Sequence, residues 1–177
     1  NNINLGNPYM IGGSSIADVD NDGDLDILIL RNGSEKNTLL LHNGDENNDG
    51  LYDVTFEKVG LDLSNNELFD ESITSSWGDY DNDGDLDLFV TNEFKNYLYE
   101  NYGNENHWIN IKLDGGGSNS SAIGSRVRVK ATISGQPTWQ LRELFSQTGA
   151  GAQNSLNAEF GLGDATIIDS IIVEWSD

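Results

Sequence analysis

The most constraining feature of this sequence is an acidic segment that occurs twice. Residues 15–29 read SIADVDNDGDLDILI and residues 76–90 read SWGDYDNDGDLDLFV, at an offset of 61 residues. A shorter match follows each copy, because NTLLLHN at residues 37–43 aligns with NYLYENY at residues 96–102. A repeat of this kind predicts two copies of one structural unit.

Each copy is expected to contain short strands separated by turns. In the first copy the predicted strands are residues 14–17, 25–30, 38–42 and 54–59, where β-branched and aromatic residues are interrupted by Asn, Asp and Gly. Four short strands with a fixed period are typical of a propeller blade. Two blades cannot close a propeller, so we expect further blades upstream or self-association of the chain.

The C-terminal part of the chain differs in charge. Residues 1–106 hold 23 acidic and 4 basic side chains, whereas residues 107–177 hold 7 and 5. This asymmetry indicates two modules with different purposes. Strands are predicted here too, at residues 108–113, 126–133, 139–145, 156–160 and 167–175, and the segment 160–163 (FGLG) is interpreted as a tight turn.

The predicted fold class is therefore all-β. Propeller-like blades with Asp-rich loops are expected over residues 1–105, and a small β-sandwich-like module over residues 106–177. No segment has the pattern of a long amphipathic helix.

Thirteen of the nineteen Asp residues lie in three nine-residue loops: loop one (18–26, DVDNDGDLD), loop two (45–53, DENNDGLYD) and loop three (79–87, DYDNDGDLD). Oxygen side chains at positions 1, 3 and 5 of such a loop converge on one point, and Gly at position 6 permits the sharp turn. Position 7 offers its backbone carbonyl and position 9 a closing carboxylate. The candidate metal ligands are thus Asp18, Asp20, Asp22, Asp24 and Asp26; Asp45, Asn47, Asp49, Leu51 and Asp53; and Asp79, Asp81, Asp83, Asp85 and Asp87.

Ca²⁺ is the ion that this pattern favours. A single Asp-rich turn is equally well explained by solvated charges, but three loops in register hold carboxylates that repel one another without a cation. An EF-hand is excluded, because position 12 is Ile29, Phe56 or Val90 within strand-like segments where an EF-hand has Glu before a helix. Mg²⁺ rarely uses an all-protein cage. We expect two calcium sites at loops one and three, and a third at loop two.

The loops and their flanking strands resemble FG-GAP or VCBS-type repeats over residues 12–102. Proteins of that family, including integrin α-chains, carry a D-x-D-x-D-G-x-x-D segment that links two strands of a propeller blade and binds Ca²⁺. Loop two departs from the usual pattern, because it follows the third strand of its unit instead of the first. The resemblance thus implies calcium-binding blades.

Residues 106–177 resemble the ASPIC/UnbV domain. The resemblance rests on Asn106–Trp108, Asn119, Ala122–Val129, Phe160–Gly163 and Val173–Trp175. This domain commonly follows FG-GAP-type repeats, as in cartilage acidic protein and its bacterial relatives. The resemblance implies an extracellular module, secreted or at the cell surface.

The net charge of −21 limits the partners of the chain. Nucleic acids and anionic membranes are polyanions and are not expected to bind such a surface. The sequence also lacks an apolar run long enough to insert into a membrane. Four cations of the C-terminal part, Arg126, Arg128, Lys130 and Arg142, have three possible roles: an anion-binding strip for an acidic glycan, the solvated faces of strands, or neutralisation of the acidic repeats.

The expected function is a calcium-binding extracellular adhesion or interaction module that recognises a protein or glycan. The alternative is a part of a secreted polysaccharide-active or phospholipase-like enzyme, and a third hypothesis is a calcium-hardened spacer. Catalysis by a carboxylate pair requires one acid with a raised pKa beside an ionised partner. Because most clustered Asp residues are assigned to metal, we expect no enzyme activity and name no catalytic residue.

Overall fold

A computed structural model describes residues 11–31, 37–44, 56–59, 72–117, 119–149 and 151–176. Within these ranges the chain forms strands, turns and bends without an α-helix, which confirms the all-β prediction. No helix long and apolar enough to cross a membrane occurs in them.

Two antiparallel sheets correspond to the two sequence repeats. The first has the order β1 (Ile11–Ala17), β2 (Asp26–Arg31), β3 (Thr38–His42) and β4 (Phe56–Val59), and the second β5 (Ser72–Gly78), β6 (Asp87–Asn92) and β7 (Tyr97–Tyr99). The register is the same in both, since Ile16 pairs with Ile27 and Trp77 pairs with Leu88 at the offset of 61. The predicted equivalence of the two copies is therefore reproduced down to single residues.

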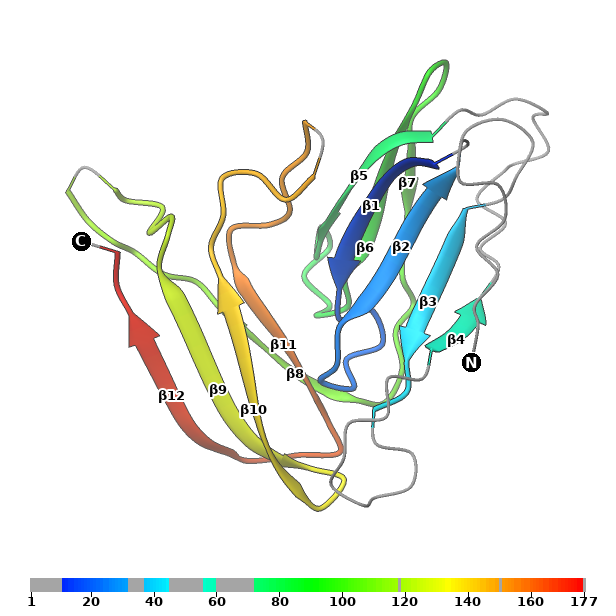
Figure 1. Cartoon of the computed structure of the whole chain (residues 1–177). Helices are drawn as coiled ribbons and strands as arrows, with labels where there is room; N and C mark the ends of the chain where they lie inside the picture. The colour runs from blue at the N-terminus through cyan, green and yellow to red at the C-terminus, as the bar shows by residue number, and fades with distance from the viewer. Residues whose placement is uncertain are drawn as a thin grey trace.

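The two sheets pack together with β1 against β5 (Figure 1). The Trp77 ring is buried between the sheets, and its Nε1–H donates to Ser15 Oγ at 2.9 Å. The Ser15 hydroxyl also lies 2.7 Å from the equivalent hydroxyl of Ser75. The shared core consists of Ala17, Leu28, Leu30, Leu39, Trp77, Leu86, Leu88 and Val90. The described strands do not close into a propeller or a barrel.

The remaining strands form two more sheets around a second core. They are β8 (His107–Ile111), β9 (Arg126–Ile133), β10 (Gln136–Glu143), β11 (Ala158–Gly163) and β12 (Ile168–Glu174), in the orders β10-β9-β12 and β11-β8. Val127, Val129 and Phe160 are buried in this core. The alternation of residues 126–133 thus places the valines inside and the cations outside, as predicted.

One sequence prediction is wrong. Residues 160–163 do not form a turn but lie in β11, paired with β8 through Phe160–Ile109 and Gly161–Trp108. Glycine at position 161 allows the Asn21 backbone to approach β11 closely, because a Cβ atom there would lie well inside contact distance of that backbone. The β11–β8 ribbon therefore packs directly against loop one.

Candidate metal centre

Loops one and three have the same backbone conformation. Loop one connects β1 to β2, and loop three connects β5 to β6 (Figure 1). Asn21 and Asn82, at position 4, have φ of 58° and 64°, and Gly23 and Gly84, at position 6, have φ of 101° and 96°. These left-handed values are available to Gly and tolerated by Asn, which explains why both residue types recur at these positions.

The position-9 carboxylate anchors each loop to the strands. In loop one Asp26 accepts N–H bonds from Val19 and His42, both at 2.8 Å. Asp87 accepts the two equivalent bonds in loop three, both at 2.9 Å. Each carboxylate is buried, so these bonds replace hydration that the oxygens lose.

Each loop gathers three carboxylates. One oxygen from each lies within 4.8 Å of the others in the groups Asp18, Asp20 and Asp22 of loop one and Asp79, Asp81 and Asp87 of loop three. Oxygens bound to one Ca²⁺ at about 2.3–2.6 Å have separations in this range. In loop one, Asp20 Oδ1 is buried and accepts no hydrogen bond from any residue that the structure describes.

The side chains at position 7 are not part of these groups. Asp24 Oδ2 lies 3.5 Å from His42 Nδ1, and Asp85 Oδ1 accepts a 2.8 Å bond from the Asn21 amide. The position-5 carboxylate of loop three, Asp83, accepts the Asp85 N–H at 3.0 Å. At position 7 the contacts of the two side chains leave the backbone carbonyl as the group that a metal could use. The loop-two candidates, Asp45, Asn47, Asp49, Leu51 and Asp53, lie outside the described residues.

Burial makes loop one electrostatically unfavourable in the absence of a cation. Desolvation raises the pKa of Asp18 to about 6, and Arg142 partly opposes this rise. Desolvation, together with neighbouring carboxylates, raises the pKa of Asp22 and of Asp26 to about 7. In loop three the pKa values of Asp81 and Asp85 are also raised, first by desolvation and then by neighbouring Asp charges.

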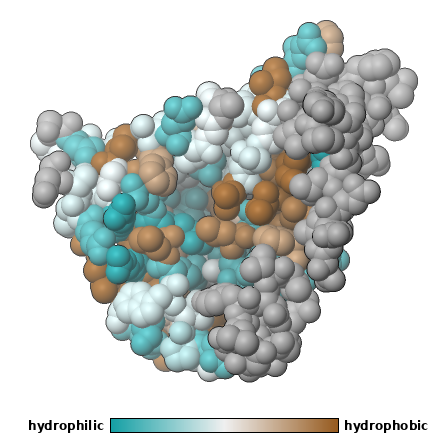
Figure 2. All heavy atoms as spheres, viewed as in Figure 1, coloured by the Kyte–Doolittle hydropathy of each residue, from teal (hydrophilic) through white to brown (hydrophobic). Residues whose placement is uncertain are grey.

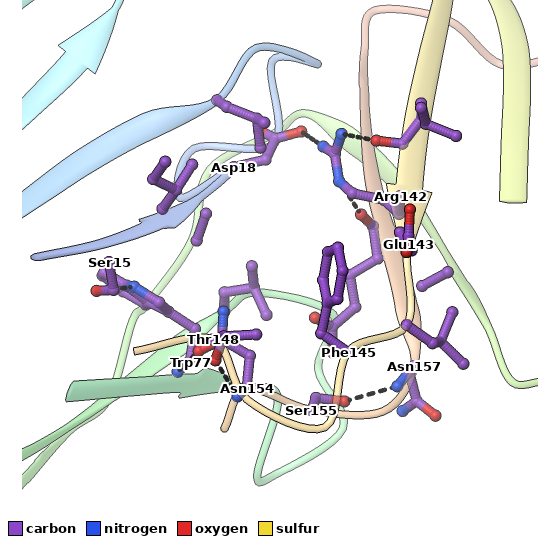
Figure 3. A pocket seen from close by; sticks show the side chains of 18 of the residues that line it. Ser15, Asp18, Trp77, Arg142, Glu143, Phe145, Thr148, Asn154, Ser155 and Asn157 are labelled. Atoms are coloured by element: carbon purple, nitrogen blue, oxygen red, sulfur yellow. Dashed lines mark hydrogen bonds and ion pairs between the residues drawn. The ribbon is translucent and has the colours of Figure 1, made fainter. Parts of the chain in front are cut away.

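The β11–β8 ribbon and β10 cover loop one. Asp18 is only 2% exposed, and its Oδ2 accepts the Gly161 N–H at 2.9 Å. The Arg142 guanidinium lies 3.4 Å from the same oxygen (Figure 3). The Gly163 N–H donates to the Asn21 carbonyl at 2.9 Å. The first loop is thus both a carboxylate cluster and the docking point of the C-terminal part.

Loop three is more open. Asp81, Asn82 and Asp83 are exposed, although the Trp108 ring packs closely on Gly84. A charged residue of the C-terminal part near this loop, Glu159, is an acid. Burial raises its pKa to about 7, and the Asp79 charge adds to the rise. Its Oε1 is buried and accepts no hydrogen bond within the described ranges.

Arg142 has the third of the roles considered for the C-terminal cations, neutralisation of the acidic repeats, because its guanidinium contacts the Asp18 carboxylate. Arg126 lies 2.7 Å from Glu143 across the β9–β10 pair, and Arg128 lies 3.2 Å from Glu174. Their exposed positions fit the solvated face of a sheet. No local sequence pattern identifies Glu159 as a functional residue.

Comparison with known families finds one match. The family model described as ASPIC and UnbV matches residues 115–177. The predicted ASPIC/UnbV resemblance is confirmed over these residues, which include β9 to β12, while β8 precedes the match. No curated protein and no solved structure gives a significant match to the chain.

Proposed function

We propose that loops one and three each bind one Ca²⁺ ion and that the protein is a calcium-stabilised interaction module. The carboxylates at positions 1, 3, 5 and 9 and the carbonyl at position 7 would hold the ion. Its charge would offset the mutual repulsion of these carboxylates and join the end of one strand to the start of the next.

The observation that carries the proposal is the buried, unpartnered oxygen of Asp20. A buried acceptor without a partner costs about 1–3 kcal/mol, and more when it is charged. This oxygen belongs to a carboxylate grouped with those of Asp18 and Asp22. A hard divalent cation satisfies all three at once, whereas Arg142 reaches only Asp18 among them.

The sheets support a blade-like interpretation of the repeats. Each is an antiparallel meander with an acidic loop after its first strand, and β1 and β5 are adjacent. We infer that they are FG-GAP or VCBS-type blades, followed by the ASPIC/UnbV domain. A secreted or cell-surface location is part of the proposal, because millimolar extracellular Ca²⁺ would saturate even weak sites. The proposed partner is a protein or a glycan.

Thermal unfolding with and without a chelator tests the calcium proposal. At a free Ca²⁺ concentration 100 times Kd, one site adds about 2.7 kcal/mol to the free energy of unfolding. We therefore expect Ca²⁺ to raise the melting temperature by many degrees and EDTA to reverse the rise. The same concentration of Mg²⁺ should have a much smaller effect.

A matched pair of variants identifies the site. Asp20→Asn should reduce the calcium-dependent shift, whereas Asp169→Asn, at an exposed residue of β12, should leave it unchanged. An identical melting curve in Ca²⁺ and in EDTA would refute the calcium proposal.

A further inference from the structure

The edge of β5 that does not pair with β6 is occupied by a segment of the same chain. The Trp77 N–H donates to the Asn154 side-chain oxygen at 3.1 Å. The Trp77 carbonyl accepts the N–H of Ser155 at 2.9 Å. Both main-chain groups of Trp77 therefore point away from β6 and are satisfied by the segment that joins β10 to β11.

The equivalent residue of β1 is Ile16, 61 positions earlier. Ile16 pairs with Ile27 as Trp77 pairs with Leu88, so the two residues hold the same place in the antiparallel ladder. In such a ladder alternate residues direct N–H and C=O away from the paired strand. Ile16, and Ser14 two residues before it, thus present these groups at the outer edge of the sheet. Within the described ranges nothing bonds to the outward groups of Ile16 as residues 154 and 155 bond to those of Trp77.

This edge opens into a cleft of about 560 Å³. Residues 14–18 line one wall and residues 141–145, which include the end of the edge strand β10, line another. The space-filling view shows a recess between the two halves, bordered by both hydrophobic and hydrophilic atoms (Figure 2). Ile16 is 54% exposed, and the half-exposed Phe145 side chain extends into the cleft (Figure 3).

The charge around the cleft favours a basic occupant. Arg142, the one cation among the described residues that line it, is paired with Asp18, and the lining carboxylate of Glu143 is paired with Arg126, so no unpaired cation among them faces the cleft. The chain as a whole carries −21. A positively charged segment would therefore be attracted to the cleft from a distance.

We propose that the outer edge of β1 binds an extended, basic peptide segment of a partner protein as an added strand. The main chain of the peptide would bond to Ser14 and Ile16 in the way that residues 154 and 155 bond to Trp77. Its apolar side chains would contact Ile16 and Phe145. This inference rests on the proposed interaction role and names the class of partner, but it requires no metal ligand in the contact.

Amide hydrogen exchange followed by NMR tests the free protein. Trp77 should exchange slowly because its N–H is bonded, and Ile16 should exchange much faster despite its equivalent place in the ladder. Equal protection of the two amides would show that the β1 edge is already occupied and would overturn the proposal.

Selection from a phage-displayed random heptapeptide library, performed in Ca²⁺, tests binding. We expect the retained peptides to be rich in Lys and Arg and to slow exchange at Ile16. Ile16→Pro removes only an outward N–H, which an edge strand tolerates, and should weaken binding about tenfold. Ile16→Ala also shortens the apolar side chain but keeps the N–H, so it should bind more tightly than Ile16→Pro and less tightly than the wild type. Melting temperatures of both variants check that each is folded.

Three outcomes would overturn the peptide proposal: no retained peptide, equal binding by Ile16→Pro and Ile16→Ala, or binding confined to a glycan array. None of these results depends on the calcium-dependent melting shift. Failure of the calcium proposal would instead appear as an unchanged melt in EDTA, so the two failures are distinguishable.

Discussion

Loops one and three differ at a single residue, Val19 against Tyr80, yet they lie in different surroundings. Both have the same left-handed positions and the same anchoring of the position-9 carboxylate. Loop one is partly covered by the β11–β8 ribbon and Leu25 is its one exposed residue, whereas positions 3 to 5 of loop three are exposed. Local sequence thus sets the shape of the loop, while tertiary packing sets its electrostatics.

The C-terminal part supplies opposite charges to the two loops. Position 1 of loop one, Asp18, lies against the Arg142 guanidinium. Position 1 of loop three, Asp79, has the acid Glu159 in its electrostatic neighbourhood. We therefore expect loop one to depend on the docked C-terminal part as well as on a cation, and loop three to depend mainly on the cation.

The largest expected effect comes from Gly161→Ala. The added Cβ meets the Asn21 backbone, which cannot move without distorting loop one. We expect the free energy of unfolding to fall by about 3 kcal/mol, measured by urea titration in Ca²⁺. The control is Gly78→Ala, where the new Cβ makes only an ordinary 3.6 Å contact and the equivalent residue is Ala17. Similar stabilities of the two variants would contradict the role assigned to the β11–loop one contact.

The next effect is that of Arg142→Met. Arg142 is 18% exposed and Asp18 only 2%, so removal of the guanidinium leaves a buried carboxylate without its cation. In EDTA we expect a loss of about 2 kcal/mol, below the usual range for a fully buried pair. In Ca²⁺ the loss should shrink, because the ion also neutralises Asp18. Arg128→Met breaks an exposed pair with Glu174, at 45% and 43% exposure, and should have little effect.

The pH dependence of stability should change sign with calcium. The pKa of Asp18 is raised to about 6 and those of Asp22 and Asp26 to about 7, above the ordinary value of 3.8. In EDTA the folded state therefore binds protons before the unfolded state does, and stability is lost as pH rises through 6 to 7. Uptake of one extra proton would add about 2 kcal/mol between pH 7 and pH 5.

In Ca²⁺ acidification should destabilise the protein, because protons compete with the metal for the same carboxylates. Calorimetric melts at pH 5, 6 and 7 in both conditions provide the comparison. Parallel pH profiles with and without the ion would contradict the assignment of these carboxylates to a metal.

The smallest expected effect distinguishes the third position of the two loops. Asp20→Asn removes a half-buried charge, one oxygen of which is buried without a partner, and should stabilise the protein in EDTA by about 1 kcal/mol. Asp81→Asn, at the exposed equivalent position, should change stability in EDTA much less. Both should lower calcium affinity, measured by titration calorimetry. Equal effects in EDTA would show that burial does not distinguish the loops.

The sequence predicted the strands best where a residue pattern repeats at short range. Strands 38–42 and 126–133 have their predicted bounds. In the second of them, the alternation of Arg and Val specifies one solvated and one buried face. The loop frame was also predictable, because Asn at position 4 and Gly at position 6 suit left-handed backbone. These features depend on neighbours close in sequence.

The contacts across the two halves could not be predicted in the same way. Asp18 and Arg142 are 124 positions apart, and their contact depends on how the β11–β8 ribbon docks. The pattern FGLG at residues 160–163 wrongly predicts a turn, because sequence alone does not distinguish a Gly needed for its φ angle from a Gly, such as Gly161, needed for close approach of another backbone. The raised pKa of Glu159 likewise follows from burial that only the fold creates.

A crystal structure determined at high resolution with Ca²⁺ present, with anomalous scattering used to identify the ion, tests the two calcium sites directly. We expect one ion in loop one and one in loop three, with oxygens at about 2.3–2.6 Å. In loop one Asp20 Oδ1 should be among these ligands. Anomalous maps without an ion at either loop, in crystals grown at millimolar Ca²⁺, would contradict the account.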